Sequence, residues 1–175
     1  MLALGLTRLF SGIGSILERR RDVNLYWVHL LWALNLFLFI VLEWWILFRW
    51  RNYQDWNFFI FGFLLLVPAL SYLLAVILFP GGQGETDFKK HFYENRAWFF
   101  GLAAILPPLD AADTLLKGYA HFEAQGPIYV IFIAVVFALT ALGAITRDER
   151  YHKFFSVFFL GYLLAFIIVN LNVIS

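Results

Sequence analysis

Long apolar runs alternate with short polar stretches along the chain. Five such runs cover residues 25–48, 58–79, 97–116, 128–145 and 154–173. Each is close to the roughly 20 residues that a helix needs to cross a bilayer. The runs are continuous, whereas the strands of a membrane barrel alternate in pieces of about ten residues. The pattern therefore predicts an all-α, polytopic bundle of five transmembrane helices.

The residues ahead of the first run show a different pattern. Apolar side chains recur there at helical spacing: Leu2, Leu6, Leu9, Phe10, Ile13, Ile16 and Leu17. This spacing predicts an amphipathic helix within residues 1–22 that lies in the membrane interface. The alternative is a frayed segment, because Gly5, Gly12 and Gly14 each weaken a helix. Residues 23–175 then form a single transmembrane domain.

The composition excludes several classes of protein. Hydrophobic residues make up 62% of the 175 residues and charged residues only 14%, so a water-soluble domain of this size could not bury its apolar surface. The net charge of +1 gives no concentrated basic face for nucleic acid. The chain has no cysteine, which excludes disulfides, thiolate metal sites and iron–sulfur clusters. The sequence also contains no recognisable catalytic motif.

The four histidines do not show the spacing of a metal or haem site. His29, His91 and His152 fall near one face of the predicted membrane domain, and His121 falls near the other. No two of them stand at i and i+4, the spacing of a helical zinc site. We interpret them as interfacial side chains and expect no metal or cofactor.

The basic residues are unevenly divided between the two sides of the predicted bundle. Ten of the 13 fall on the side of the N-terminus. These ten are Arg8, Arg19, Arg20, Arg21, Lys89, Lys90, Arg96, Arg147, Arg150 and Lys153, and the other three are Arg49, Arg51 and Lys117. Lys and Arg near the ends of spans favour the cytoplasmic side. We therefore expect a bacterial-type inner or plasma membrane protein with its N-terminus in the cytoplasm and its C-terminus outside.

Three acidic residues fall inside the predicted spans, where charge is costly and often marks a functional site. Glu43 lies near the outer end of the first span, and Asp110 and Asp113 lie near the outer end of the third. The two spans run in the same direction, so Glu43 and Asp110 are expected at nearly the same depth. Asn170 lies at a similar depth on the fifth span. We expect these four residues to form an ion- or proton-binding cluster that opens to the outside.

Structural roles are the alternative for two of these carboxylates. Asp113 has Lys117 four residues further on the same helix and can pair with it. Asp110 and Asp113 also follow two prolines, and acidic residues in the first turn of a helix complement its dipole. Glu43 has no cation on its own helix. It must therefore be protonated, reach the interface or find a partner on another helix.

Prolines interrupt two of the predicted spans. Pro107 and Pro108 leave the carbonyls of Ala103 and Ala104 without helical partners, and Pro68 lies in the middle of the second span. Paired broken spans are typical of transporter binding sites, where unwound carbonyls coordinate ions. We expect a true helix break at the double proline and a tolerated kink at Pro68.

Two further sets of residues concern packing and the membrane surface. Small side chains on the last two spans predict close packing of these two helices on each other, with an oligomer interface as the alternative. They are Ala134, Ala138, Ala141, Gly161 and Ala165. Basic side chains on the cytoplasmic side are expected to contact lipid headgroups or a partner. They are Arg19, Arg20, Arg21, Arg147 and Arg150.

Three hypotheses of function follow. In the first, the protein is a small, oligomeric ion channel or ion- or proton-coupled transporter that uses the outer carboxylates. In the second, it is a non-catalytic membrane module: an anchor, a chaperone or a subunit of a larger membrane complex. In the third, it is an intramembrane enzyme that modifies a lipid with Asp110 and Asp113. We take the first hypothesis, because a passive module needs neither Glu43 nor the paired Pro107 and Pro108.

Overall fold

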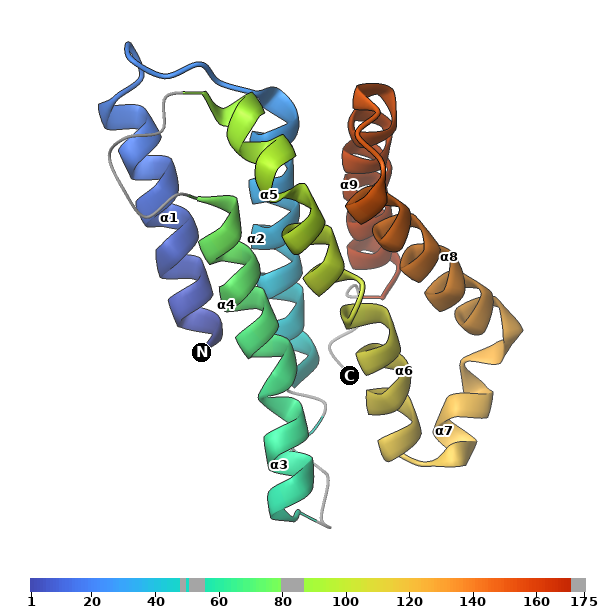
Figure 1. The fold of residues 1–175 in the computed structure, drawn as a ribbon. Coiled ribbons are helices and arrows are strands. Elements are labelled where there is room, and N and C mark those ends of the chain that lie inside the picture. The colour runs from blue at the N-terminus through green and yellow to red at the C-terminus, as the bar shows by residue number, and fades with distance from the viewer. Residues whose placement is uncertain (48–49, 51–55, 80–86, 171–175) are drawn as a thin grey trace.

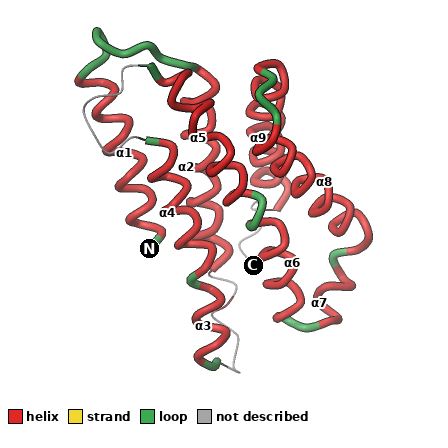
Figure 2. The backbone as a smooth tube through the Cα atoms, in the orientation of Figure 1, coloured by secondary structure: helices red, strands yellow, loops and turns green. Residues whose placement is uncertain are grey.

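The computed structural model describes residues 1–47, 50, 56–79 and 87–170, the last two as backbone only. Within these residues the chain forms helices and no strand (Figures 1 and 2). The helices are α1 (Leu2–Glu18), α2 (Trp27–Leu47), α3 (Phe58–Leu64), α4 (Leu66–Leu78), α5 (Phe88–Ala103), α6 (Leu106–Leu116), α7 (Tyr119–Ala124), α8 (Gly126–Ile145) and α9 (Glu149–Asn170). The all-α prediction is confirmed.

Five helical stretches of the described chain are long and apolar enough to cross a membrane, as predicted. They are α2, α3 with α4, α5 with α6, α8, and α9. Two of them begin earlier than the apolar pattern indicated. The third span starts at Phe88 and the fifth at Glu149, so each span carries charged turns at its beginning.

Asp87 accounts for the early start of α5. Its carboxylate accepts hydrogen bonds from the backbone N–H groups of Lys89, at 2.9 Å, and Lys90, at 3.0 Å. These are two of the four N–H groups that the start of a helix leaves without a partner. Hydropathy does not reveal this boundary, because capping depends on one polar side chain and not on the apolar content of the turns that follow.

The two spans with a proline in their middle are interrupted ahead of it. The first interruption is at Leu65, between α3 and α4, and the second is at Ala104 and Ile105, between α5 and α6. The Ile105 N–H donates to the Leu102 carbonyl at 3.1 Å, a tighter turn than in an α-helix. All three interrupting residues keep right-handed helical dihedral angles. Each span is therefore broken in its hydrogen bonding without an extended segment between its halves.

Residues Leu2–Glu18 form the helix predicted for this region, and one of its faces is buried. The buried residues are Leu2, Gly5, Leu9, Gly12 and Ile16. This face packs lengthwise along α4 and also contacts α2 (Figure 1). A Cβ at Gly5 would lie 3.1 Å from Ile40 Cδ1 and 3.8 Å from the Tyr72 backbone, so the glycine lets the helices approach closely. The location of α1 in a membrane interface stays a prediction.

The C-terminal end of α4 is bonded to three other helices. The last carbonyls of a helix have no N–H partner within the helix. Here the carbonyls of residues 77–79 accept, in order, from His91 Nε2 of α5 at 3.1 Å, His29 Nε2 of α2 at 2.6 Å and Arg8 Nη2 of α1 at 2.7 Å. We call this set of bonds the α4 cap. It joins α1, α2 and α5 to a single helix end.

The end of α8 is capped in a similar way. Arg96 of α5 donates to the Thr146 carbonyl at 2.9 Å and to the Ile145 carbonyl at 3.3 Å. His152 Nε2 of α9 lies 3.1 Å from the same Thr146 oxygen. His29 and His152 are both 0% exposed. These histidines therefore lie inside the bundle as partners of helix ends, and their depth in a membrane stays a prediction.

Aromatic rings fill the space between α2, α5 and α9. The Trp32 ring is surrounded by four phenylalanine rings with centroids 5.0 to 5.7 Å away. They belong to Phe99, Phe100, Phe155 and Phe159. Most of these contacts are edge-to-face, the arrangement that aromatic quadrupoles favour.

Basic residues gather at one end of the bundle, which we call the basic end. There Lys89 of α5 pairs with Glu149 of α9 at 2.7 Å, and Lys153 pairs with the other Glu149 oxygen at 2.8 Å. An isolated bridge joins Asn24 to Asp87 at the same end. Lys117 lies at the opposite end of its span, at the close of α6.

The small residues of α8 and α9 do not pack on each other. Four of these five residues are exposed, and Ala141 is half-buried. The exposed four are Ala134, Ala138, Gly161 and Ala165. A Cβ at Gly161 would meet nothing within 4 Å. α8 packs mainly on α5 and α6, and α9 packs on α2. Where α8 and α9 meet, the large rings of Phe132 and Tyr162 stack at 4.3 Å, so bulky side chains rather than small ones set that contact.

We expect Gly12→Ala to lower the melting temperature of the detergent-solubilised protein. A Cβ at Gly12 would lie 2.2 Å from Phe79 Cγ, and overpacking a buried contact costs about 1–3 kcal/mol. Gly14→Ala is the matched control, because its Cβ would meet nothing within 4 Å and alanine favours a helix by roughly 0.5–1 kcal/mol. A Gly12→Ala protein as stable as this control would contradict the packing of α1 on α4.

Candidate functional site

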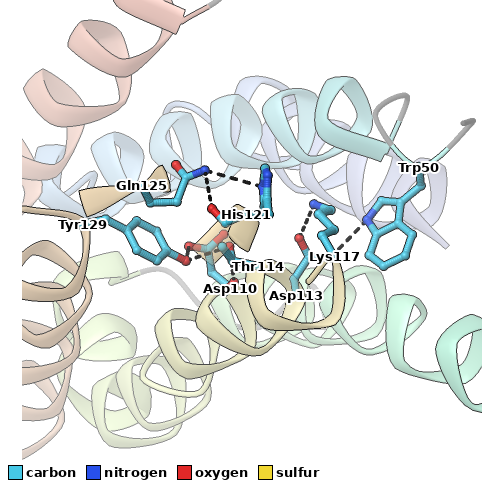
Figure 3. Close-up of polar contacts among 8 residues, drawn as sticks. All are labelled: Trp50, Asp110, Asp113, Thr114, Lys117, His121, Gln125 and Tyr129. Carbon is cyan, nitrogen blue, oxygen red and sulfur yellow. Dashed lines mark hydrogen bonds and ion pairs between the residues drawn. The ribbon is translucent and has the colours of Figure 1, made fainter. Parts of the chain in front are cut away.

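The carboxylates of α6 belong to a polar cluster between α6, α8 and the chain beyond α2 (Figure 3). Asp113 accepts from the indole Nε1 of Trp50 at 3.1 Å through Oδ1. Its Oδ2 pairs with Lys117, and the Lys117 ammonium lies 5.0 Å from the centre of the Trp50 ring. Both Asp113 oxygens therefore have donors, as the structural alternative for this residue required.

Asp110 lies on the neighbouring turn and contacts α8. Its Oδ2 accepts a hydrogen bond from the Tyr129 hydroxyl at 2.8 Å. The Thr114 hydroxyl lies 2.9 Å from the Tyr129 hydroxyl and 3.0 Å from the Asp110 carbonyl (Figure 3). Asp110 thus has one side-chain donor where Asp113 has two.

Glu43 approaches this cluster from α2. It is half-buried and lies within electrostatic range of Asp110, Asp113 and Lys117. In the described part of the chain, its carboxylate forms no hydrogen bond and no ion pair with another side chain. Glu43, Asp110 and Asp113 are therefore brought together in space, and of these three only Glu43 has no donor among the described side chains.

The charges of the cluster do not balance among the described side chains. There, three carboxylates, on Glu43, Asp110 and Asp113, lie near one ammonium group, that of Lys117. If all four groups were ionised, two negative charges would remain in excess among these side chains, and a charge without a partner is strongly unfavourable away from water. Carboxylates in this situation hold protons or bind a cation, and coupled groups share those protons. The arrangement is thus suited to binding a proton or an ion.

The other predicted site residues are three prolines and Asn170, which lie on α4, α6 and α9. Asn170 is the last residue of α9, and its side chain lies outside what the structure describes. Pro107 and Pro108 are the second and third residues of α6, one turn before Asp110. Pro68 holds the third position of α4 and is buried in the bundle.

Sequence reasoning did not identify Trp50, Thr114 or Tyr129 as members of the cluster. Thr114 follows Asp110 by four residues, so helical spacing alone could have placed both on one face. Tyr129 is 19 residues from Asp110 and Trp50 is 63 residues from Asp113. No local pattern joins residues so far apart. His121 and Gln125 of the intervening segment contact each other, through Gln125 Nε2 and the His121 carbonyl at 3.4 Å (Figure 3).

The basic residues predicted to contact lipid have no acidic partner in the described structure. Arg20, Arg21, Arg147 and Arg150 are exposed and Arg19 is half-buried. The ion pairs at this end use lysines instead, on Glu149 and Glu94. The five arginines are thus open to solvent or headgroups.

We expect Lys117→Met to destabilise the protein more than the double change Lys117→Met with Asp113→Asn. The single change leaves a carboxylate in a largely buried place, with side-chain exposure of 18% for Asp113, and an unsatisfied buried polar group costs roughly 1–3 kcal/mol. The second change removes that charge and keeps an oxygen for Trp50. Melting temperatures in detergent test this. If both proteins lost the same stability, the Asp113 carboxylate would not depend on the Lys117 ammonium.

The comparisons with known proteins add no relative. No family model matches the chain, and neither curated proteins nor solved structures give a match. The function must therefore be argued from the site itself.

Proposed function

We propose that this protein moves ions or protons across a membrane, as a small channel or ion- or proton-coupled transporter, and binds them at Glu43 and Asp110. The observation that carries the proposal is the Glu43 carboxylate, which has no partner among the described residues and lies within electrostatic range of two other carboxylates. An ionised carboxylate inside a membrane domain costs free energy, and such residues commonly mark a functional site. Binding of a proton or cation would remove that cost.

The three carboxylates divide into one structural and two binding groups. Asp113 has donors on both oxygens, from Trp50 and Lys117, and holds the cluster together. Among the described residues Asp110 has a side-chain donor only on Oδ2, so its Oδ1 faces no such competitor there. Asp110 and Glu43 are therefore the pair that we assign to the ion or proton.

We propose that the basic end faces the cytoplasm, with the N-terminus inside and the C-terminus outside. Lys89, Arg96 and Lys153 all lie at that end, which supports this orientation through the preference of Lys and Arg for the cytoplasmic side. We place the C-terminal end of α1 at the same interface. A homo-oligomer or a larger membrane complex would supply further pore-lining surface to this small bundle.

Cysteine labelling tests the orientation cleanly, because the chain has no cysteine of its own. Glu123→Cys lies in α7 and Arg147→Cys lies between α8 and α9, and both positions are exposed. In intact cells we expect a membrane-impermeant maleimide to label Glu123→Cys, and to label Arg147→Cys only after the cells are permeabilised. The reverse pattern would invert the topology.

Flux into proteoliposomes tests the function. We expect the wild-type protein to carry proton or cation flux above that of protein-free vesicles, and Glu43→Gln and Asp110→Asn each to reduce it at least tenfold. Each change removes a charge and keeps the size of the side chain. Glu123→Gln, an exposed position of α7, is the control and should leave the flux unchanged. Background flux from the wild type and from both variants alike would sink the proposal and leave the membrane-module hypothesis.

A further inference from the structure

The inner half of α2, toward the basic end, carries three buried polar atoms that have no hydrogen-bond partner in the described structure. They are His29 Nδ1, Trp32 Nε1 and Asn35 Oδ1. The residues follow one another at intervals of three, so their side chains lie on adjoining turns of one side of the helix. His29 and Asn35 are each 0% exposed and Trp32 is 4% exposed. A buried polar group left unsatisfied costs about 1–3 kcal/mol and calls for a water or ion to partner it.

The three atoms have complementary hydrogen-bonding roles. His29 Nε2 must donate to the Leu78 carbonyl, so Nδ1 keeps its lone pair and is an acceptor. Trp32 Nε1 is a donor only. The Asn35 amide nitrogen donates to the Ser156 carbonyl at 2.9 Å, which leaves Asn35 Oδ1 as an acceptor. A water molecule can donate to either acceptor and accept from the indole, whereas a metal cation would be repelled by the indole N–H.

A small cavity adjoins this side of α2. Its volume is ≈ 10 Å³, and His29, His91 and Asn95 are among the residues that border it. The rings of His29 and His91 lie 6.2 Å apart, and Asn95 Nδ2 lies 3.3 Å from His91 Nδ1. The volume is that of a single water molecule, and the cavity does not extend to Trp32 or Asn35. By size the cavity admits one water beside His29.

The same helix carries the unpartnered carboxylate of the outer half. Glu43 lies eight residues beyond Asn35, which is about 12 Å along a helix. Leu36 and Ile40, on the intervening turns, are 5% and 0% exposed. Buried apolar side chains exclude water and raise the barrier to a proton or ion. The polar inner half of α2 is thus separated from Glu43 by a short apolar section.

The acidic cluster itself favours a proton over a metal cation. Hard metal cations take six or more oxygen ligands. Here Asp113 uses both oxygens for Trp50 and Lys117, and one Asp110 oxygen accepts from Tyr129. The Lys117 ammonium also repels a cation. A proton needs only one free carboxylate oxygen.

We propose that the transported species is the proton, and that water molecules held by His29, Trp32 and Asn35 form the inner arm of its path to Glu43. This inference rests on the proposed transport function. In each step a water accepts one proton and releases another, so no group of the arm changes its net charge. The apolar section at Leu36 and Ile40 separates the arm from Glu43 and limits the rate.

Trp32→Phe tests the arm, because it removes the indole donor and keeps an aromatic ring in the cluster. We expect this variant to lower the proton flux in liposomes at least tenfold. Trp27→Phe is the control, since Trp27 is 48% exposed and lies outside the buried set. Gel filtration and melting temperature verify that both variants are folded. A folded Trp32→Phe protein with wild-type flux would overturn the path.

Leu36→Asn tests the apolar section in the opposite direction. A polar side chain there admits water between Asn35 and Glu43, so we expect the proton flux to rise severalfold while potassium permeability stays at background. Leu34→Asn is the matched control, because Leu34 is 44% exposed and faces away from the buried side. An unchanged flux, or an equal rise in the control, counts against the apolar section as the limiting barrier.

Solid-state NMR separates this inference from the proposed function. With 15N-tryptophan protein in lipid bilayers, magnetisation should pass from water to the Trp32 indole nitrogen, whose signal is assigned by its loss in Trp32→Phe. Water at Trp32 without any proton flux in the wild type would overturn the transport function. Flux without water at Trp32 would overturn the water path alone.

Discussion

The fold depends above all on the way in which the C-terminal carbonyls of α4 find donors. A buried backbone carbonyl that has no hydrogen-bond partner costs several kcal/mol. Arg8, His29 and His91 supply the donors from α1, α2 and α5. The last carbonyls of α4 need hydrogen-bond donors, and this need fixes the positions of three other helices. The equivalent bonds from Arg96 and His152 to the end of α8 join α5 and α9 to it.

The polar groups of the two ends of the bundle have different balances of donors and acceptors. At the basic end, imidazole and guanidinium groups meet backbone carbonyls, and most of the groups are satisfied. At the other end, three carboxylates meet Lys117, the Trp50 indole and the Tyr129 hydroxyl. Among the described side chains, Glu43 has no donor there. Two observations give a physical reason to look for a mobile proton in this bundle of packed rings. One is the lack of a described donor at Glu43, and the other is the set of buried polar atoms of α2 that have no described partner.

Features that depend on residues close together in the sequence could be predicted. Features that depend on residues far apart in the sequence could not. The Asp113–Lys117 pair follows from spacing on one helix, and the interruptions before Pro68 and before Pro107 follow from the missing proline N–H. The histidines were placed at the interface because each stands near a span end, yet His29 and His152 are fully buried. They are buried where their ring nitrogens donate to backbone carbonyls at the ends of α4 and α8. The small residues of α8 and α9 likewise predict a contact that the stacked Phe132 and Tyr162 rings replace.

The sequence by itself predicted the helices, the five stretches apolar enough to cross a membrane and the acidic residues within them, because hydropathy and helical spacing act over a few turns of one segment. It also put Glu43 and Asp110 at comparable depth. Only the tertiary structure decided which of the carboxylates has donors. Trp50 and Asp113 are 63 residues apart, and Asn35 and Ser156 are 121 residues apart. Such partners are chosen by how whole helices pack, and packing depends on the shapes of all the side chains between them.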